Sequence, residues 1–484
     1  MSSSPVARRA HLLLSLLLCG AGALGFLPSC HGAAEETPGY VTVSAASFKP
    51  SSICSAPDPA AAPHQQNGTS AVLRLTHRHG PCAPSRASSL AAPAPSVADT
   101  LRADQRRAEY ILRRVSGAGA EPQLLGSSKA SASVPASWGY DIGTLNYVVT
   151  ASLGTPGVAQ TLEVDTGSDL SWVQCKPCAD GSSCYSQKDP LFDPSQSSSY
   201  AAVPCGGSTC AALGMYASGC SASQCGYVVS YGDGSNTTGA YSSDTLTLSP
   251  TDAVQGFLFG CGHAQTGLFT GIDGLLGLGR LQVSLVGQTA AAYGGSFSYC
   301  LPTKPSTTGY LALGSGGGGA AAKGFATTQL LPSPSGPTYY IVMLTGISVG
   351  GQSLSVPPSA FAGGTVVDTG TVVTRLPPSA YAALRAAFRS GVAPYGYPPA
   401  PPNGILDTCY NFAGYGTVTL PTIALTFSSG ATMTLGADGI LSFGCLAFAP
   451  SGSDGGMAIL GNVQQRSFEV RIDGTSVGFK PSSC

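Results

Sequence analysis

The chain has 484 residues, a net charge of −1 and only 10% charged residues. This composition excludes a disordered polyelectrolyte, and the charge balance gives no overall basic character for binding nucleic acid. The length allows more than one domain, and 64 glycines with 43% hydrophobic residues favour a loop-rich, mainly β protein with a large core.

Residues 1–31 have the pattern of a targeting segment. Arg8 and Arg9 precede the apolar run 12–18, and small residues at 21–23 offer a cleavage site, which we place near 23–32. The apolar run is too short to span a membrane. We predict a signal peptide, and the alternative is an organelle transit peptide, because the segment is basic and contains no acidic residue. The C-terminus has no hydrophobic tail, so we expect no membrane anchor.

Residues 32–135 are rich in Ala, Ser and Pro and contain one predicted helix, from Ser96 to about Val115. Ser96 can cap it, with Asp99 in the first turn. Apolar residues form a stripe along it, and we assign its arginines to the remaining surface: Val97, Leu101, Ala108, Ile111, Leu112 and Val115 against Arg102, Arg106, Arg107, Arg113 and Arg114. The alternatives are a solvated linker helix or a nucleic-acid-binding helix, but aromatic residues do not alternate with its arginines and no second basic patch accompanies it.

Upstream of this helix lies the sequence His77-Arg-His79-Gly-Pro-Cys82. Two histidines and a cysteine can suggest a metal site, but no further ligand cluster accompanies them, so we predict no metal. The mature region is expected to begin between Ser131 and Asn146.

From residue 146 onward the sequence alternates short strand patterns with turns rich in Gly, Ser and Asn, as in 146–153 and 240–248. One helix is predicted from Ser379 to about Ser390, after two prolines that suit a helix start. The glycine run 316–319 is read as a linker near the seam between two lobes.

The central motif is Asp165-Thr166-Gly167-Ser168, which returns as Asp368-Thr369-Gly370-Thr371. Each copy follows an apolar strand. Two carboxylates held face to face share one proton, so that one acts as a base and the other as an acid and a water between them can attack an amide. Ser168 and Thr371 can hold the outer carboxylate oxygens, and glycine permits a tight turn beside each acid. The alternative is two unrelated turns.

A later apolar-apolar-Gly strand follows each acid loop, within 273–279 and 458–462, so the order of motifs is an internal repeat. This constellation resembles the pepsin-type (family A1) aspartic proteases over roughly residues 140–484. The dozen cysteines after residue 146 and the 77–82 sequence resemble the nepenthesin-like plant subgroup. The second loop departs from the usual Asp-Ser-Gly-Thr of these relatives, but Thr369 keeps the hydroxyl.

The resemblance implies a mainly β, bilobal fold, with two related β-barrel-like lobes and the active site in the cleft between them. It implies a propeptide at 32–135, an N-terminal lobe at 136–325 and a C-terminal lobe at 326–484. It also implies an aspartic endopeptidase that hydrolyses peptide bonds at acid pH, is made as a zymogen and needs no cofactor. Expected partners are peptide or protein substrates and the chain's own propeptide, with no nucleic acid, and the protein is expected to be a monomer. The expected location is the apoplast or vacuole, with the chloroplast as the alternative.

Twelve of the 16 cysteines lie after residue 146, and an even number in a chain with a signal peptide predicts six disulfides there, whose connectivity the sequence leaves open. The spacing Cys175-x-x-Cys178 also fits a zinc or redox motif, but no βαβ pattern surrounds it. The resemblance implies the pairs Cys175–Cys178, Cys184–Cys261, Cys205–Cys225, Cys210–Cys220, Cys300–Cys484 and Cys409–Cys445.

The segment Val228–Ser235 followed by 245–248 predicts a β-hairpin with a glycine-rich tip. It resembles the flap of the family, with Tyr231, Gly232 and Asp233 over the substrate and the Tyr231 hydroxyl bonded to Trp172. The alternative is an exposed surface hairpin. Asn67 and Asn236 lie in glycosylation triplets.

The rival to a protease is a catalytically inactive, xylanase-inhibitor-like binding protein on the same fold. That hypothesis predicts a lost acid or a broken flap, and both acids and Tyr231 are present. Residues 24–135 carry 10 Lys+Arg and 7 Asp+Glu, against 11 and 17 in residues 136–484. We therefore predict a propeptide held largely by charge and released on acidification, earlier at high salt. The candidate contacts are Arg74, Arg78 and the helix arginines.

Overall fold

The structure, a computed structural model, describes residues 39–48, 53–55, 71–78, 80–83, 96–116, 146–180, 183–269, 271–314, 324–333 and 336–481. The predicted targeting segment, Asn67, the glycine run 316–319, Cys484 and the predicted start of the mature region before Asn146 lie outside these residues. All described residues belong to the unit Thr37–Cys484.

In the described part of the chain, fifteen strands form one large sheet. Its order is β14 (Ala326–Gln329), β30 (Ser476–Pro481), β29 (Phe468–Ile472), β12 (Phe297–Cys300), β13 (Thr308–Leu313), β2 (Ala71–His77), β3 (Tyr147–Leu153), β4 (Val158–Asp165), β11 (Gly274–Gly277), β5 (Trp172–Gln174), β10 (Asp252–Thr266), β9 (Asn236–Ser249), β8 (Gln224–Ser230) and β7 (Ala217–Ser221), with β6 (Ala201–Ala202) on β9. The mainly β fold predicted from the sequence is confirmed.

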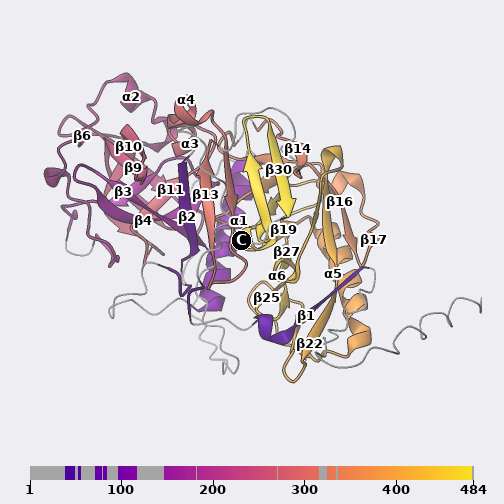
Figure 1. The fold of residues 1–484 in the computed structure, drawn as a ribbon. Coiled ribbons are helices and arrows are strands. Elements are labelled where there is room, and N and C mark those ends of the chain that lie inside the picture. Colours follow the sequence, from indigo (N-terminus) through magenta and orange to yellow (C-terminus); the bar gives the residue numbers. More distant parts are fainter. Residues whose placement is uncertain are drawn as a thin grey trace, which may run out of the picture. The chain divides into compact units, whose positions relative to one another are not determined.

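Smaller sheets carry most of the second half of the chain (Figure 1). One has the order β15 (Ile341–Val342), β18 (Thr365–Val367), β28 (Ala458–Leu460), β19 (Thr374–Leu376) and β27 (Phe448–Pro450). The others are β17 (Gln352–Ser353), β16 (Leu344–Val349), β23 (Ile423–Phe427) and β24 (Thr432–Thr434); β20 (Pro399–Ala400), β21 (Cys409–Tyr410), β26 (Cys445–Leu446) and β25 (Leu441–Ser442); and β1 (Tyr40–Ser44) with β22 (Thr417–Pro421).

The predicted repeat appears directly in the strand pairing. β4 ends at the first acid and runs parallel to β11, so that Val164 lies opposite Leu276. In the same way β18 runs into the second acid loop and lies parallel to β28, with Val367 opposite Leu460. Each acid loop therefore emerges beside the apolar-apolar-Gly strand that the sequence predicted for it.

Both predicted helices are present. α1 spans Val97–Val115, and the Ser96 side chain accepts a hydrogen bond from the Asp99 backbone N–H. α5 spans Pro378–Val392, slightly longer than predicted, and buries Tyr381, Leu384 and Phe388. The remaining α-helices of the described residues are one-turn elements: α2 (Ser208–Ala211), α3 (Leu285–Gln288), α4 (Ala290–Tyr293), α6 (Ala437–Ile440) and α7 (Asn462–Gln465).

α1 lies between strands of the large sheet and strands of the second half of the chain (Figure 1). Its apolar stripe packs on the second half, with Leu101 against Val372 and Val373 and with Ile111 against Ile341. Among the helix arginines that the sequence offered as candidate contacts, Arg107 is the one that turns inward, and its side chain is only 13% exposed. Position 107 is three residues after Asp104, and this spacing places both side chains on one helix face.

The segment before residue 96 contributes strands to both halves. β2 inserts between β13 and β3 in the large sheet, and β1 pairs with β22. Directly after β2, Arg78 forms a buried ion pair of 2.9 Å with Glu163 on β4. Three strands beyond residue 325, β14, β29 and β30, also join the large sheet, which therefore continues across the predicted lobe boundary.

The disulfides differ from the pairing that the resemblance implied. Cys409–Cys445 is present, and Cys300 is disulfide-bonded, although its predicted partner lies outside the described residues. Four predicted pairs, Cys175–Cys178, Cys184–Cys261, Cys205–Cys225 and Cys210–Cys220, are wrong. The structure instead has Cys175–Cys261, Cys178–Cys184, Cys205–Cys220 and Cys210–Cys225, together with Cys54–Cys82 before α1.

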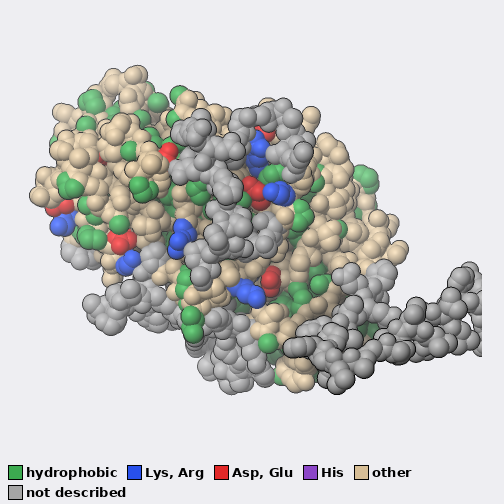
Figure 2. Space-filling model, viewed as in Figure 1, with side chains coloured by type: hydrophobic (Ala, Val, Ile, Leu, Met, Phe, Trp, Pro, Cys, Tyr) green, Lys and Arg blue, Asp and Glu red, His purple; other side chains and the backbone are tan. Residues whose placement is uncertain are grey.

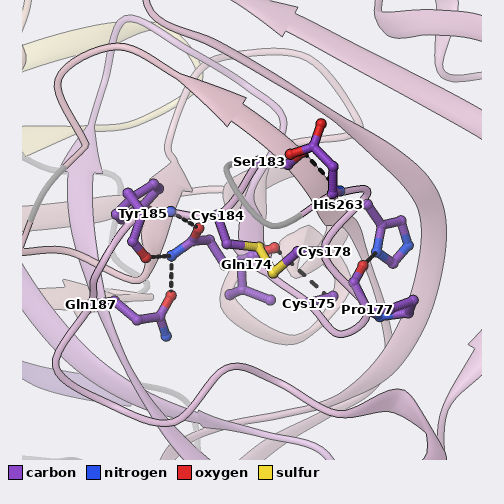
Figure 3. Close-up of a disulfide and its surroundings, with 11 residues drawn as sticks. Gln174, Cys175, Pro177, Cys178, Ser183, Cys184, Tyr185, Gln187 and His263 are labelled. Atoms are coloured by element: carbon purple, nitrogen blue, oxygen red, sulfur yellow. Dashed lines mark hydrogen bonds between the residues drawn. A yellow bond between two sulfur atoms is a disulfide. The ribbon is translucent and has the colours of Figure 1, made fainter.

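Strand pairing explains these corrections. β5 and β10 run parallel, and the Cys175 backbone N–H donates to Gly262, so Cys175 lies beside Cys261. Cys178 is left in the following loop, where it reaches Cys184 (Figure 3). Cys220 and Cys225 lie opposite each other in the β7–β8 hairpin, and Cys225 is buried whereas Cys220 is exposed and bonds Cys205. Cys225 is buried against the same core cluster as Cys210 and takes it as its partner.

Candidate active site

The two Asp-Thr-Gly loops are joined by their threonines. The Thr166 backbone N–H donates to the Thr369 hydroxyl at 3.1 Å, and the Thr369 backbone N–H donates to the Thr166 hydroxyl at 2.9 Å. Each hydroxyl in turn donates to a carbonyl of the opposite strand, Thr166 to Val367 and Thr369 to Val164. Because every donor and acceptor in this buried cross-link is paired, the two loops are fixed relative to each other.

The cross-link holds the two acids in matching surroundings. Ser168 donates its hydroxyl to Asp165 at 2.7 Å, and Thr371 donates its hydroxyl to Asp368. The backbone N–H of the glycine two residues after each acid donates to its inner oxygen, at 2.9 Å in the first loop and 3.0 Å in the second. Both carboxyl groups are fully buried. The predicted contacts of Ser168 and Thr371 with the acids are therefore present in the structure.

The glycines of the loops allow close approach rather than an unusual turn. A Cβ on Gly167 would lie 2.7 Å from an Asp368 oxygen, and one on Gly370 would lie 2.8 Å from an Asp165 oxygen. Neither glycine has a positive φ. Any side chain at these positions would separate the two acids, which is why glycine is needed twice.

Arg107 of α1 binds both acids at once. Its Nη2 atom lies 2.7 Å from Asp165 Oδ1 and 2.9 Å from Asp368 Oδ1, and its Nε atom donates to Asp368 Oδ2 at 3.0 Å. One guanidinium nitrogen bonded to both inner oxygens shows that the carboxylates face each other. The guanidinium therefore occupies the space between them.

Burial and ion pairing shift the pKa values of Asp368 and Arg107 in opposite directions. Burial alone would raise the pKa of Asp368, but Arg107, with hydrogen bonds from Thr371 and Gly370, lowers it below the ordinary value. Burial alone would lower the pKa of Arg107, but Asp165 and Asp368 raise it well above the ordinary value. The geometry thus favours the ionised form of Asp368 beside the Arg107 cation.

The predicted flap is the hairpin of β8 and β9, with Ser230 paired to Asn236. At its tip, Gly234 has φ +90°, and its backbone N–H donates to the carbonyl of Tyr231. The predicted bond is present, because the Trp172 indole N–H donates to the Tyr231 hydroxyl at 2.7 Å. Gly232 packs so closely on α1 that a Cβ would lie 2.7 Å from the Arg107 Cα.

α1 also makes two polar contacts on either side of Arg107. Arg106 donates to the backbone carbonyl of Asp233 at the flap tip, at 2.9 Å. On the opposite side, Asp104 accepts hydrogen bonds from Val372 and Val373 backbone N–H groups and from Arg375 at 2.7 Å. Both partners of the Asp104–Arg375 ion pair are 1% exposed. The helix therefore closes the space between the flap and the second acid loop.

Sequence reasoning missed four buried polar residues of this site: Asp104, Asp169, Arg375 and Asn462. Asp169 accepts hydrogen bonds from Tyr216 and Thr338, and Asn462 donates to the Thr369 carbonyl. Only their place in the sequence could have indicated two of these residues, because Asp169 and Arg375 closely follow the two acid loops. Arg74 is the one exposed residue of β2, which is otherwise buried or half-buried.

Charged side chains are few and interspersed on the face shown in Figure 2. Within the described ranges, no three His, Cys, Asp or Glu residues gather in a way that could hold a metal ion. Of the helices in that part of the chain, none combines the length and apolar character of a membrane span.

Two family models match the chain. Residues 147–315 match the N-terminal domain of the xylanase inhibitors, and residues 339–481 match their C-terminal domain. The crystal structure of edgp is similar to this fold, with a TM-score of 0.58 and 24% identity, and covers 70% of this chain and 92% of that chain. This likeness concerns the bilobal β fold alone.

Curated proteins that are similar to this chain over most of its length are named as proteases. An aspartyl protease family protein of Arabidopsis thaliana is 42% identical over 464 residues, covering 94% of this chain and 95% of the relative. Aspartic proteinase nepenthesin-2 of Nepenthes gracilis is 37% identical over 358 residues, covering 70% of this chain and 78% of the relative. With its paired acid loops and its β fold, the chain belongs to the pepsin-type aspartic protease family, in the nepenthesin-like plant subgroup.

Proposed function

We propose that this protein is an aspartic endopeptidase that acts at acid pH and is made as a zymogen. The observation that carries the proposal is the pair Asp165 and Asp368, whose inner oxygens bind one nitrogen of Arg107 at 2.7 and 2.9 Å. Carboxylates this close share one proton once the guanidinium leaves. The expected substrates are peptides and proteins.

In the proposed reaction, a water takes the place of the Arg107 guanidinium between the acids. The ionised carboxylate accepts a proton from this water as its oxygen attacks the amide carbon. The protonated carboxyl group gives its proton to the carbonyl oxygen, and a neutral tetrahedral diol forms. The dyad then gives its proton to the amide nitrogen, and the C–N bond breaks as one diol hydroxyl returns a proton to the other carboxylate. The products are an acid and an amine, and the dyad again holds one proton.

The surroundings support each step. The Ser168 and Thr371 hydroxyls and the glycine N–H groups hold the carboxylates without blocking the space between them. The hairpin tip 231–235 would cover a bound peptide and exclude bulk water. The hydrogen bond from Trp172 to the Tyr231 hydroxyl supports this role, because it holds the tyrosine ring in place.

In this proposal the segment 32–135 is the inhibitory propeptide. α1 fills the cleft, Arg107 takes the place of the reactive water, and β2 is built into the large sheet. The segment also has its own disulfide, Cys54–Cys82. A peptide substrate and α1 cannot occupy the same space, so cleavage requires α1 to leave.

Acid can drive this release through the dyad. Docked α1 favours the ionised form of Asp368, and the lowered pKa of Asp368 stabilises docking above the ordinary carboxyl pKa. This stabilisation is lost as the pH falls toward the lowered value, because the free dyad takes up a proton. Burial raises the pKa of Asp104, so protonation of that residue works in the opposite direction. We therefore assign the acid response to Arg107 and the dyad.

The rival function is an inactive binding protein, and the names of the matching family models come from such inhibitors. The intact acid pair and hairpin favour the protease. The test is digestion of an unfolded protein from pH 2 to pH 8, with and without pepstatin, which mimics the tetrahedral intermediate. We expect cleavage in the acid range, blocked by pepstatin. No cleavage at any pH, or a maximum at neutral pH, would contradict the proposal.

A further inference from the structure

Arg375 is a buried cation whose charged partner belongs to the propeptide. It lies on β19, seven residues after Asp368, and its side chain is 1% exposed. Its Nη2 atom donates to Asp104 at 2.7 Å, while its Nε and Nη1 atoms have no hydrogen-bond partner in the described part of the chain. Burial lowers the pKa of Arg375, and the charges that oppose this effect, Asp104 and Glu109, both lie on α1.

Release of α1 would therefore uncover a cation that has lost its carboxylate. A buried charge without a partner is costly, so the site favours a ligand that restores the pair. The ligand also meets the backbone N–H groups of Val372 and Val373, which now donate to Asp104. Three donors converging on one carboxylate form a site suited to an acidic side chain.

The position of this site relative to the dyad follows from helix geometry. Asp104 precedes Arg107 by three residues, or about 4.5 Å along the helix axis at 1.5 Å per residue. An extended peptide advances about 3.3 Å per residue. A side chain that replaces Asp104 would therefore belong to the first or second residue from the bond that lies over the dyad.

We propose that Arg375 is a specificity-determining residue that binds an Asp or Glu side chain of the substrate, one or two residues from the cleaved bond. This inference rests on the proposed protease function. In the zymogen, Asp104 occupies the same subsite. Leu101, one turn earlier, packs against Val372, Val373 and Leu406, so the neighbouring subsite is apolar.

The experiment uses the full-length protein activated by acid and a library of unstructured peptides. Mass spectrometry of the products should show Asp and Glu enriched at one position within two residues of the cut. A matched pair of peptides with Glu or Gln at that position then gives the ratio of kcat/KM values, with active sites counted by pepstatin titration. At pH 5 we expect Glu to be preferred by about tenfold to hundredfold, the range of a charged hydrogen bond.

Two readouts separate binding of substrate from a merely structural role. The preference for Glu should differ between pH 3 and pH 5, because a free Glu side chain protonates near pH 4.3 and burial raises the pKa of a carboxyl group in this subsite, as it does for Asp104. Arg375→Met should bring the Glu/Gln ratio close to one, while Arg375→Lys should retain part of it. Arg389→Met is the matched control, since Arg389 is exposed on α5, and it should leave the ratio unchanged.

The possible outcomes are distinct. Cleavage without acidic enrichment, or a Glu/Gln ratio that is the same at pH 3 and pH 5, overturns the inference and leaves the protease function intact. A ratio that survives in Arg375→Met also overturns it. If Arg375→Met does not fold, the pH dependence of the wild-type ratio and the Arg375→Lys ratio decide. A protein that neither cleaves peptides nor binds pepstatin overturns the proposed function itself.

Discussion

The two acid loops have nearly the same internal structure and very different neighbours. In each loop a hydroxyl three residues after the acid and a glycine N–H two residues after it bind the carboxylate. Each threonine donates to the opposite loop. Around the first loop lie the hairpin with Tyr231 and the buried Asp169, and beside the second lie β19 with Arg375.

This difference separates two tasks. The repeated part presents two equivalent acids, and equivalent acids are what a shared proton requires. The unrepeated parts receive α1, which bonds the hairpin through Arg106 and the second loop through Asp104. Symmetry in the molecule thus accompanies the proposed chemistry, and asymmetry accompanies the proposed inhibition and specificity.

The strongest test of the equivalence is to remove each acid in turn. Asp165→Asn and Asp368→Asn should each reduce kcat/KM by at least about a hundredfold, because general acid and base catalysis both fail. Peptide cleavage at the optimum pH measures this, with circular dichroism to verify folding. A folded variant with near-normal turnover would show that only one acid acts in the reaction.

The next largest effect is expected from Arg107, which contacts both loops. Arg107→Gln leaves the two acids without their cation. Breaking a buried ion pair costs about 3–5 kcal/mol, and here this cost weakens the docking of α1. The precursor should bind pepstatin and begin processing at a higher pH than the wild type. Gel analysis of processing from pH 7 to pH 3 measures the shift.

Arg102→Gln is the control for this prediction. Arg102 pairs with Asp99 on the exposed side of α1, and this ion pair contributes at most about 1 kcal/mol to stability.

The buried Arg107 triad also changes the expected salt effect. Salt screens buried pairs less than exposed ones, so salt should move the processing pH less than the net charges of the two segments suggest. Unchanged processing in Arg107→Gln would contradict the assigned role.

The surroundings of the two loops also differ in their disulfides. Four described bridges lie in the segment 175–261, which follows the first loop. Loss of Cys175–Cys261, with a sequence separation of 86, should destabilise the protein by about 4–5 kcal/mol. Loss of Cys178–Cys184, with a separation of 6, should cost only about 2 kcal/mol. Urea unfolding of the two double-alanine variants measures the difference, and equal losses would argue against the observed connectivity.

The smallest effects are expected at the threonines that join the loops. Thr166→Val and Thr369→Val should each cost about 1–3 kcal/mol, since each leaves buried groups of the opposite loop unpaired. Thr369→Ser keeps the hydroxyl and loses one methyl group, so it should cost under about 1 kcal/mol. Urea unfolding again measures these values. Clearly unequal losses for the two valine variants would show that the cross-link is not symmetric.

Local sequence determined the elements whose signals lie close together in the chain. The paired acid loops, the hairpin with its glycine tip, the capped helix α1 and the proline-started helix α5 all follow from patterns shorter than about twenty residues. Each is specified by hydrogen bonds and periodicity within or next to the element, so a linear reading was sufficient.

Tertiary structure alone decided which distant residues meet. Cysteine connectivity depends on the parallel pairing of β5 with β10 and on which side of the β7–β8 hairpin faces the core. The spacing of the cysteines in the sequence predicts neither of these. The choice of Arg107 among the helix arginines, and the pairing of Asp104 with Arg375, depended on how α1 is rotated against the second acid loop. Periodicity predicts an apolar face, but it left open which helix arginine meets the acids, because a buried charge can be recognised only when its partners are in place.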